Sequence, residues 1–160
     1  MLEARGEWRL FSDADLSAPI EELPKLFEAA QRTGHEVAIG SRALDRSLVG
    51  KRQSAFREFS GRLFNFAMRL VTGLPYRDTQ CGFKLFRSDV ARVVAARQQS
   101  DGFGFDVEIL YIARKHGFRI LEVPVRWFNV EGTKVSLFNG VSAFADPLRV
   151  RWNDIKGLYK

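Results

Sequence analysis

The order of short apolar strands and amphipathic helices is the feature that most limits what this chain can fold into. An apolar stretch at 8–11 runs into the polar residues 12–15, and a helical pattern follows from about 19 to 33 and stops at Gly34. A second apolar stretch occupies 37–39. Strands that alternate with helices predict an α/β sheet with helices on its faces.

The remainder of the chain continues this alternation. Further strands are expected at 82–86 and 119–127, and further helices at 51–72, 88–97, 106–116 and 141–156. The 160 residues contain no repeat and no linker, so we expect one domain over 1–160. An open α/β sheet normally has several strands before its ligand-binding edge, and the acidic segment 12–15 comes unusually early. The pattern therefore predicts a fold whose first part is absent from this chain.

Composition excludes several classes of protein. Hydrophobic residues make up 46% of the chain and include 14 Phe, so a disordered chain is excluded. The lone Cys81 cannot form an intrachain disulfide, no apolar run approaches the ~18 residues that span a bilayer, and the N-terminus has no signal-peptide core. We expect a soluble, cytosolic domain. Its net charge of +6 favours anionic partners: nucleic acid, phospholipid headgroups or phosphorylated small molecules.

The sharpest local motif is the pair of carboxylates Asp13 and Asp15, just past the first strand. Two carboxylates separated by one residue can share a divalent cation that is bound to a diphosphate. The same residues can also form an acidic turn that caps the following helix. Position at the end of an apolar strand strengthens the metal interpretation, but the pattern alone leaves both open.

The longest expected helix, 51–72, is apolar along one half and basic along the other. Its apolar half carries Phe56, Phe59, Leu63, Phe64, Phe66, Ala67, Leu70 and Val71, and its basic side carries Lys51, Arg57, Arg62 and Arg69. Such a helix can lie in a membrane interface. It can equally pack on the sheet with a solvated basic face, and periodicity does not separate the two.

Other polar residues have simpler interpretations. Cys81 is expected to be a small buried residue rather than a reactive thiol, because no second cysteine accompanies it. Asp106 and Glu108 stand at a helix start, where the helix dipole already explains acids. His35 and His116 each lie beside a glycine at a helix end and are expected to have capping or surface roles.

Five motifs in one order connect the chain to a known family. They are Phe-Ser-Asp-Ala-Asp-Leu-Ser at 11–17, Gly-Ser-Arg at 40–42, Asp-Thr-Gln-Cys-Gly-Phe-Lys-Leu-Phe at 78–86, Phe-Asp-Val-Glu-Ile-Leu at 105–110 and Glu-Val-Pro-Val-Arg-Trp at 122–127. The chain resembles glycosyltransferase family 2, and within it the branch of dolichyl-phosphate glucosyltransferases and polyprenyl-phosphate mannosyltransferases. The resemblance implies a GT-A-like α/β sandwich, N-terminally truncated, because the family's opening Pro-Ala-Tyr-Asn-Glu strand is absent.

The resemblance also implies roles for individual residues. Asp13 and Asp15 would hold Mg²⁺ or Mn²⁺ on the diphosphate of the donor. The residues matched to the reaction centre are Asp78, Gln80 and Asp106. Those matched to substrate binding, including the acceptor's phosphate, are Arg42, Arg57, Ser60, Lys84 and Lys134. Ser17 stands where mannosyltransferase relatives often have a metal-contacting Gln, which favours glucose over mannose.

The implied activity is metal-dependent, inverting transfer of a hexosyl group from UDP-glucose or GDP-mannose to a polyprenyl phosphate, at the cytosolic face of a membrane. The 160 residues alone are expected to be inactive, since the nucleoside-binding strands are absent. One alternative is a family member that acts on a soluble or polysaccharide acceptor, for which the Phe side of helix 51–72 would be covered by protein. Others are a membrane-docking remnant and a basic nucleic-acid-binding module. No nucleic-acid partner is expected, because basic residues and exposed aromatics do not align in any binding motif.

Overall fold

The computed structural model describes residues 1–50, 65–102, 104–128 and 145–160. Its strands are β1 (Trp8–Ser12), β2 (Val37–Ser41), β3 (Phe83–Arg87) and β4 (Ile120–Pro124). Its helices are α1 (Leu23–Thr33), α3 (Ser88–Arg97), α4 (Phe105–Lys115) and α6 (Asp146–Ile155), with 3-10 turns at Ile20–Glu22 and Arg46–Leu48, and residues 65–72 are also helical. The predicted α/β class is confirmed.

The strands form one mixed sheet in the order β1-β3-β2-β4. Strand β3 runs antiparallel to both of its neighbours, while β2 and β4 are parallel. In the described part of the chain, β1 and β4 are the edge strands of this sheet. Because β3 is reversed, the residues before it lie at the same edge of the sheet as the residues that follow β1, β2 and β4.

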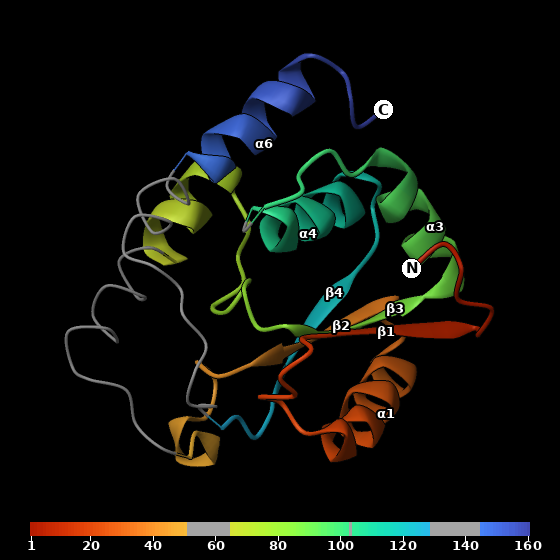
Figure 1. The fold of residues 1–160 in the computed structure, drawn as a ribbon, viewed down its shortest axis with the longest axis vertical. Coiled ribbons are helices and arrows are strands. Elements are labelled where there is room, and N and C mark those ends of the chain that lie inside the picture. Colours follow the sequence, from red (N-terminus) through yellow and green to blue (C-terminus); the bar gives the residue numbers. More distant parts are fainter. Residues whose placement is uncertain (51–64, 103, 129–144) are drawn as a thin grey trace.

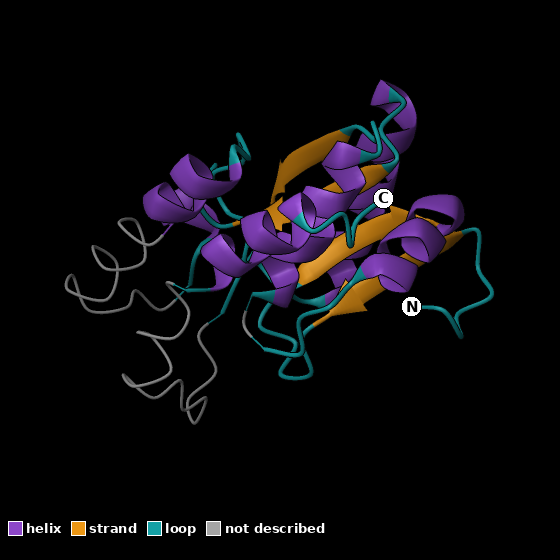
Figure 2. Cartoon of the chain, turned by 90° about the horizontal axis from the view of Figure 1, so that it is seen from above, coloured by secondary structure: helices purple, strands orange, loops and turns teal. Residues whose placement is uncertain are grey.

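Helices cover both faces of the sheet. Helix α1 packs on one face, and α3 and α4 pack on the other, with α6 outside α4 (Figure 1). The view from above shows the strands as a layer between helices (Figure 2). Helix α1 ends where Gly34 adopts a left-handed φ of 69°, and the next amide, that of His35, donates to the carbonyl of Ala30 at 3.0 Å. The predicted glycine stop is confirmed.

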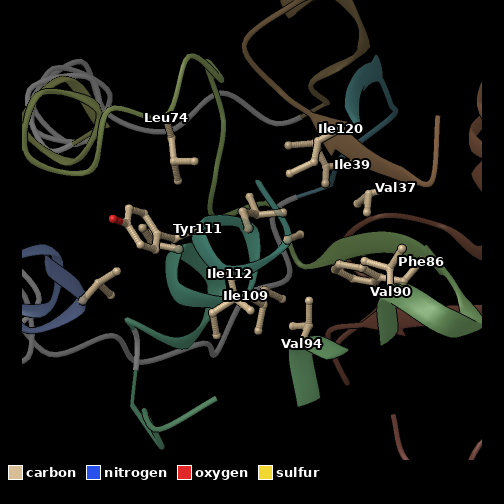
Figure 3. Packing of buried hydrophobic residues seen from close by; sticks show 14 of the residues in the cluster. Val37, Ile39, Leu74, Phe86, Val90, Val94, Ile109, Tyr111, Ile112 and Ile120 are labelled. Atoms are coloured by element: carbon tan, nitrogen blue, oxygen red, sulfur yellow. The ribbon is translucent and has the colours of Figure 1, made fainter. Parts of the chain in front are cut away.

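Alternation along the strands divides the core in two. Val37, Ile39 and Phe86 point toward α3 and α4, where they pack with the side chains labelled in Figure 3. Ala38 and Leu85 point the other way, into a second cluster beneath α1. All five side chains are at most 2% exposed. Neighbouring residues on one strand thus serve two separate cores.

Two boundaries differ from the expectation. The last strand ends at Pro124 instead of 127, because its partner β2 ends at Ser41, opposite Pro124; further on, the backbone N–H of Trp127 donates to the carbonyl of Leu48 in the 3-10 turn at 3.1 Å. The first helix begins with a 3-10 turn, so its α-helical part starts at Leu23. The expected helix 51–72 is present at 65–72, while 51–64 and 141–144 lie outside the described residues. Within the described ranges, no helix is long and apolar enough to cross a membrane.

Candidate functional site

The sheet register gathers the predicted site residues at one edge. Ser12 of β1 lies opposite Phe83, and Ile39 of β2 lies opposite Lys84. Ser41 lies opposite Pro124. The segments 13–15, 41–42, 78–82 and 125–127 therefore meet at this edge, although they are far apart in sequence.

Asp13 lies directly against Gly82. The backbone N–H of Asp13 donates to the carbonyl of Gly82 at 2.8 Å. A Cβ at position 82 would lie 1.9 Å from the Asp13 carboxyl carbon, so only glycine leaves room for that carboxylate. Asp15 accepts a hydrogen bond from the backbone N–H of Ser17 at 3.0 Å, which orders the turn after β1.

Arg42 and Asp78 form the best-defined ion pair of the site. Asp78 accepts from Nε of Arg42 at 2.7 Å, from Nη2 at 2.8 Å and from the Arg42 backbone N–H at 2.9 Å. The guanidinium also lies over the ring of Trp127, 5.4 Å from its centroid. The Asp78 side chain is only 6% exposed, whereas that of Arg42 is 34% exposed. The pair therefore presents its cationic member to solvent.

Glu122 of β4 holds Asp78 from behind. Its two carboxylate oxygens accept from the backbone N–H groups of Arg77 and Asp78, both at 2.9 Å. A carboxylate that bridges two successive amides fixes the backbone there. The position of Asp78, and through it of Arg42, is thus set by a strand on the far side of β2.

A second ion pair lies deeper. The Lys84 ammonium is completely buried, pairs with Asp106 at the start of α4, and donates to the carbonyl of Cys81 at 2.8 Å. It also lies 5.7 Å from the centroid of the Phe11 ring. The interpretation of Asp106 as a helix-start acid is therefore incomplete, because this carboxylate also neutralises a buried cation from β3.

The pKa shifts show that these groups act on one another. Partial burial raises the pKa of Asp13, and the carboxylates of Asp106 and Asp15 raise it further, against the lowering effect of Lys84 and Arg42. Burial also opposes ionisation of Asp78, but the charge and hydrogen bonds of Arg42 outweigh it and hold the pKa of Asp78 below its usual value. Asp13 thus carries negative charge that its surroundings only partly compensate.

The residues present fit a divalent cation. The described part of the site holds four carboxylates and two cationic side chains, listed together here: Asp13, Asp15, Asp78, Asp106, Arg42 and Lys84. Added positive charge beside Asp13 would offset the burial and the neighbouring carboxylates that together raise its pKa. Among the described residues, no three His, Cys, Asp or Glu side chains are arranged to hold a metal ion unaided. Mg²⁺ commonly uses one or two carboxylates and completes its shell with substrate phosphates and water.

Other predicted residues fall in different places. Gln80 is half-buried in the turn before β3, at the same edge as Asp78. Cys81 is 1% exposed, and burial raises the pKa of its thiol to about 12, in agreement with the expected buried role. His35 contacts the hydroxyl of Thr33 at 2.7 Å, as expected for a residue at a helix end. Arg57, Ser60 and Lys134 lie outside the described residues.

Three supporting residues carried no predicted role. Glu122 and Trp127 belong to the motif 122–127, which was noted only for its resemblance. Glu22, 2% exposed, accepts from Arg126 Nε and from Lys25 Nζ, both at 2.5 Å, and so joins the start of α1 to the end of that motif. The available signal was the set of acidic, basic and aromatic residues Glu122, Arg126 and Trp127 in and just after a strand, but their partners are 44 to 104 positions away.

The helical residues 65–72 expose part of the apolar side predicted for helix 51–72. Phe66 and Leu70, one helical turn apart, are 61% and 75% exposed. Met68 and Thr72 are buried and anchor this segment on the core. Within its described turns, Phe66 and Leu70 are therefore largely open to solvent, while Ala67 and Val71 of the same side are half-buried.

Sequence comparison places this chain in a family. The model of glycosyl transferase family 2 matches residues 1–94, more than half of the chain. The chain belongs to glycosyltransferase family 2, and the GT-A type of fold expected from the motifs is that of the family. The family resemblance is thereby confirmed.

Similar proteins from several organisms carry the same name. The chain is 38% identical to a dolichyl-phosphate beta-glucosyltransferase of Drosophila melanogaster over 86% of this chain and 44% of the relative. It is 33% identical to the dolichyl-phosphate beta-glucosyltransferase of Homo sapiens, over all of this chain and 51% of the relative, and 31% identical to that of Saccharomyces cerevisiae over 99% and 51%. The chain thus spans about half the length of the curated relatives it matches.

Proposed function

We propose that this chain forms part of a glycosyltransferase that moves a glucosyl group from a nucleotide sugar, UDP-glucose in preference to GDP-mannose, to a polyprenyl phosphate of the dolichyl type. The observation that carries the proposal is the meeting of Asp13 and Asp15 with the Arg42–Asp78 and Lys84–Asp106 pairs at one sheet edge. The names of the relatives supply the sugar and the lipid.

The proposed reaction does not need a strong general base. A phosphomonoester is largely dianionic near pH 7, since its second pKa is about 6. One of its oxygens can attack the anomeric carbon of the donor as the bond from that carbon to the nucleoside diphosphate breaks. A single displacement of this kind inverts an α-linked donor to a β-linked product. The site must therefore hold two anions close together and stabilise the departing diphosphate.

The residues of the site divide this work. Arg42 presents a cation at the site edge and binds the acceptor's phosphate, while Asp78 and Trp127 keep its guanidinium in place. For Lys84, which is completely buried, we propose a positioning role toward Asp106 and the backbone at Cys81 in place of the substrate binding implied by its motif. Asp13 and Asp15 would hold Mg²⁺ or Mn²⁺, which supplies positive charge to the donor diphosphate. Gln80 keeps the reaction-centre role implied by the resemblance, and Arg57, Ser60 and Lys134 keep the implied substrate-binding roles.

A lipid acceptor is favoured over a soluble one by the helical segment 65–72. A soluble acceptor predicts that the Phe-containing side is covered by protein, whereas Phe66 and Leu70 are largely exposed. Exposed apolar side chains on a basic helix suit the interface of a bilayer, where a polyprenyl chain resides. The proposed location is accordingly the cytosolic surface of a membrane.

The test is transfer of labelled glucose from UDP-glucose to dolichyl phosphate by the protein made from its whole gene. Asp15→Asn should abolish transfer in the presence of Mg²⁺ or Mn²⁺ while circular dichroism and thermal unfolding stay unchanged, because a bound ion loses an anionic ligand. Asp101→Asn, at an exposed acid in the loop after α3, is the matched control and should keep full activity. Full activity of Asp15→Asn would contradict the metal assignment, and transfer to a soluble acceptor alone would contradict the lipid.

The 160-residue chain by itself is expected to lack transfer activity and measurable affinity for UDP-glucose. Two carboxylates bind a divalent cation weakly unless a diphosphate completes its shell. In the described sheet β1 is an edge strand, so this sheet has no further strand beside Asp13 that could bind a nucleoside. Titration calorimetry with UDP-glucose and Mn²⁺ checks this, and tight binding would contradict it.

A further inference from the structure

Helix α6 is apolar on two sides. Pro147 and Val150 are buried against the core. Leu148, Trp152 and Ile155, spaced i, i+4 and i+7, are 61%, 57% and 73% exposed. A surface helix of a globular protein normally keeps only its core-facing side apolar and turns polar residues outward. This second apolar stripe therefore indicates that the outer side of α6 contacts an apolar environment outside the domain.

Cationic residues flank this exposed stripe. At 100° per residue, Arg149 and Lys156 fall on one side of the line through Leu148 and Trp152, and Arg151 falls on the other. The Lys156 ammonium lies 5.2 Å from the centroid of the Trp152 ring. An apolar stripe with a central tryptophan and lysines or arginines on its margins is typical of helices that lie in the plane of a membrane interface.

A basic hollow of about 300 Å³ adjoins the helix. It is lined by Thr72, Gly73, Tyr111, Arg114, Lys115 and Arg151. Arg114 donates to the carbonyl of Gly73 at 2.5 Å, and Arg151 donates to the Tyr111 hydroxyl at 2.7 Å. Lys115 pairs with Asp154, which also lies 3.9 Å from Arg151. Lys115 and Arg151 thus share the carboxylate of Asp154, while Arg114 bonds to a backbone carbonyl, so the three cations of the hollow outnumber the one carboxylate paired with them, and the hollow has room for a phosphate group.

The hollow is distinct from the site at the sheet edge that is proposed for glucosyl transfer. Asp106 of that site stands at the start of α4, whereas Arg114 and Lys115 stand at its end, about 12 Å further along the helix axis at 1.5 Å per residue. The helical residues 65–72, with Phe66 and Leu70 exposed, end at the same hollow. Figure 1 shows α6 outermost on the α4 side of the sheet, away from α1.

We infer that the exposed stripe of α6 (Leu148, Trp152 and Ile155) inserts into an anionic lipid bilayer while the hollow at Arg114, Lys115 and Arg151 takes a lipid headgroup phosphate. Charge complementarity selects this partner: a bilayer offers apolar chains beneath a layer of anions, matching the apolar stripe and its cationic margins. The inference rests on the proposed function in that a polyprenyl phosphate acceptor lies in a membrane. Vesicle binding is measured without donor or acceptor, so either proposal can fail alone.

The experiment is co-sedimentation of the full 160-residue chain with vesicles of phosphatidylcholine, and with vesicles of phosphatidylcholine and phosphatidylserine in equal parts. The chain should bind the mixed vesicles more tightly, and salt should weaken that binding. Trp152→Ser should reduce partitioning about tenfold or more, the value of one large apolar side chain. Arg114→Gln and Arg151→Gln should each reduce it about fivefold on the mixed vesicles only.

Matched controls distinguish binding through this surface from nonspecific binding of the chain to vesicles. Leu2→Ser removes an apolar side chain that is 56% exposed near the N-terminus, and Arg32→Gln removes an exposed cation of α1; both should leave binding unchanged. Trp152→Phe should bind almost normally but lose the vesicle-induced blue shift of tryptophan emission, which locates the contact at α6. Failure of the wild-type chain to bind mixed vesicles would overturn the inference. Equal losses in Trp152→Ser and Leu2→Ser would overturn it too, as would a vesicle-free dimer that dissociates in Trp152→Ser.

Discussion

The two basic regions of this molecule use their cations differently. At the sheet edge, Arg42 is held by three hydrogen bonds to Asp78, and Lys84 is fully buried against Asp106. At the far end of α4, the side chains of Lys115 and Arg151 are 31% and 47% exposed. The first region matches each cation with its own carboxylate, while in the second Lys115 and Arg151 share the carboxylate of Asp154.

This difference distinguishes cations that hold neighbouring groups in position from cations that can bind an anion from outside. A buried, fully paired cation cannot be removed cheaply, because the carboxylate left behind has lost its compensation. An exposed cation in high dielectric contributes little to folding and remains able to meet an anion from outside. The sheet edge is thus built to hold a fixed arrangement of charges, and the hollow beside α6 is suited to attract anions. Four substitutions test this contrast.

The largest effect is expected at Lys84. Lys84→Met leaves Asp106 and the carbonyl of Cys81 without their partner, so the free energy of unfolding should fall by about 3 kcal/mol or more. Urea denaturation of the chain measures it. The double variant Lys84→Met, Asp106→Leu should recover much of the loss, because no buried charge then lacks a partner. A single variant as stable as the wild type would remove the distinction between the two regions.

The next largest effect concerns substrate at Arg42. In the protein made from its whole gene, Arg42→Ala should raise the KM for dolichyl phosphate roughly ten- to a hundredfold, corresponding to about 1.5–3 kcal/mol for a charge-assisted hydrogen bond. The KM for UDP-glucose should change much less. Arg32→Ala, in α1, serves as control. Unchanged acceptor dependence would mean that Arg42 only holds Asp78. Arg57→Ala, outside the described residues, is expected to act in the same direction.

Acid should weaken the sheet edge through Asp78. Its pKa in the folded chain lies below the usual value of 3.8, so its stabilising contribution is complete above about pH 4 to 5 and is lost as the pH falls through the folded value. We expect Asp78→Asn to be less stable than the wild type by roughly 1.5–3 kcal/mol at pH 7 and the gap to narrow below pH 4. Thermal unfolding across pH measures this, and a gap that widens in acid would contradict it.

The smallest stability effect is expected at Arg151. Arg151→Gln removes an exposed donor to the Tyr111 hydroxyl and a weak pair with Asp154, so unfolding should change by less than about 1 kcal/mol. The same substitution should nevertheless weaken binding to anionic vesicles about fivefold. A loss of stability as large as that of Lys84→Met would show that the hollow is a structural element of the fold.

The sequence by itself determined most of the elements and the family, and it predicted the residues of the candidate site. Apolar periodicity located the strands near 8–12, 37–41 and 83–87, and a glycine marked the end of α1, because these signals are local in the chain. The motifs around Asp13, Arg42, Asp78 and Asp106 indicated glycosyltransferase family 2, which sequence comparison confirms. The roles assigned to those residues remain predictions.

Only the tertiary structure decided which of these residues are partners. Asp78 and Arg42 are 36 positions apart and Lys84 and Asp106 are 22 apart, and the reversed strand β3 brings all four to one edge. Burial then separates Lys84, whose side chain is completely buried, from Arg42, which is partly exposed. Likewise, α6 showed a weak helical pattern in the sequence, and only packing revealed that Trp152 faces outward. Pairing and exposure depend on contacts between distant segments, which no local pattern encodes.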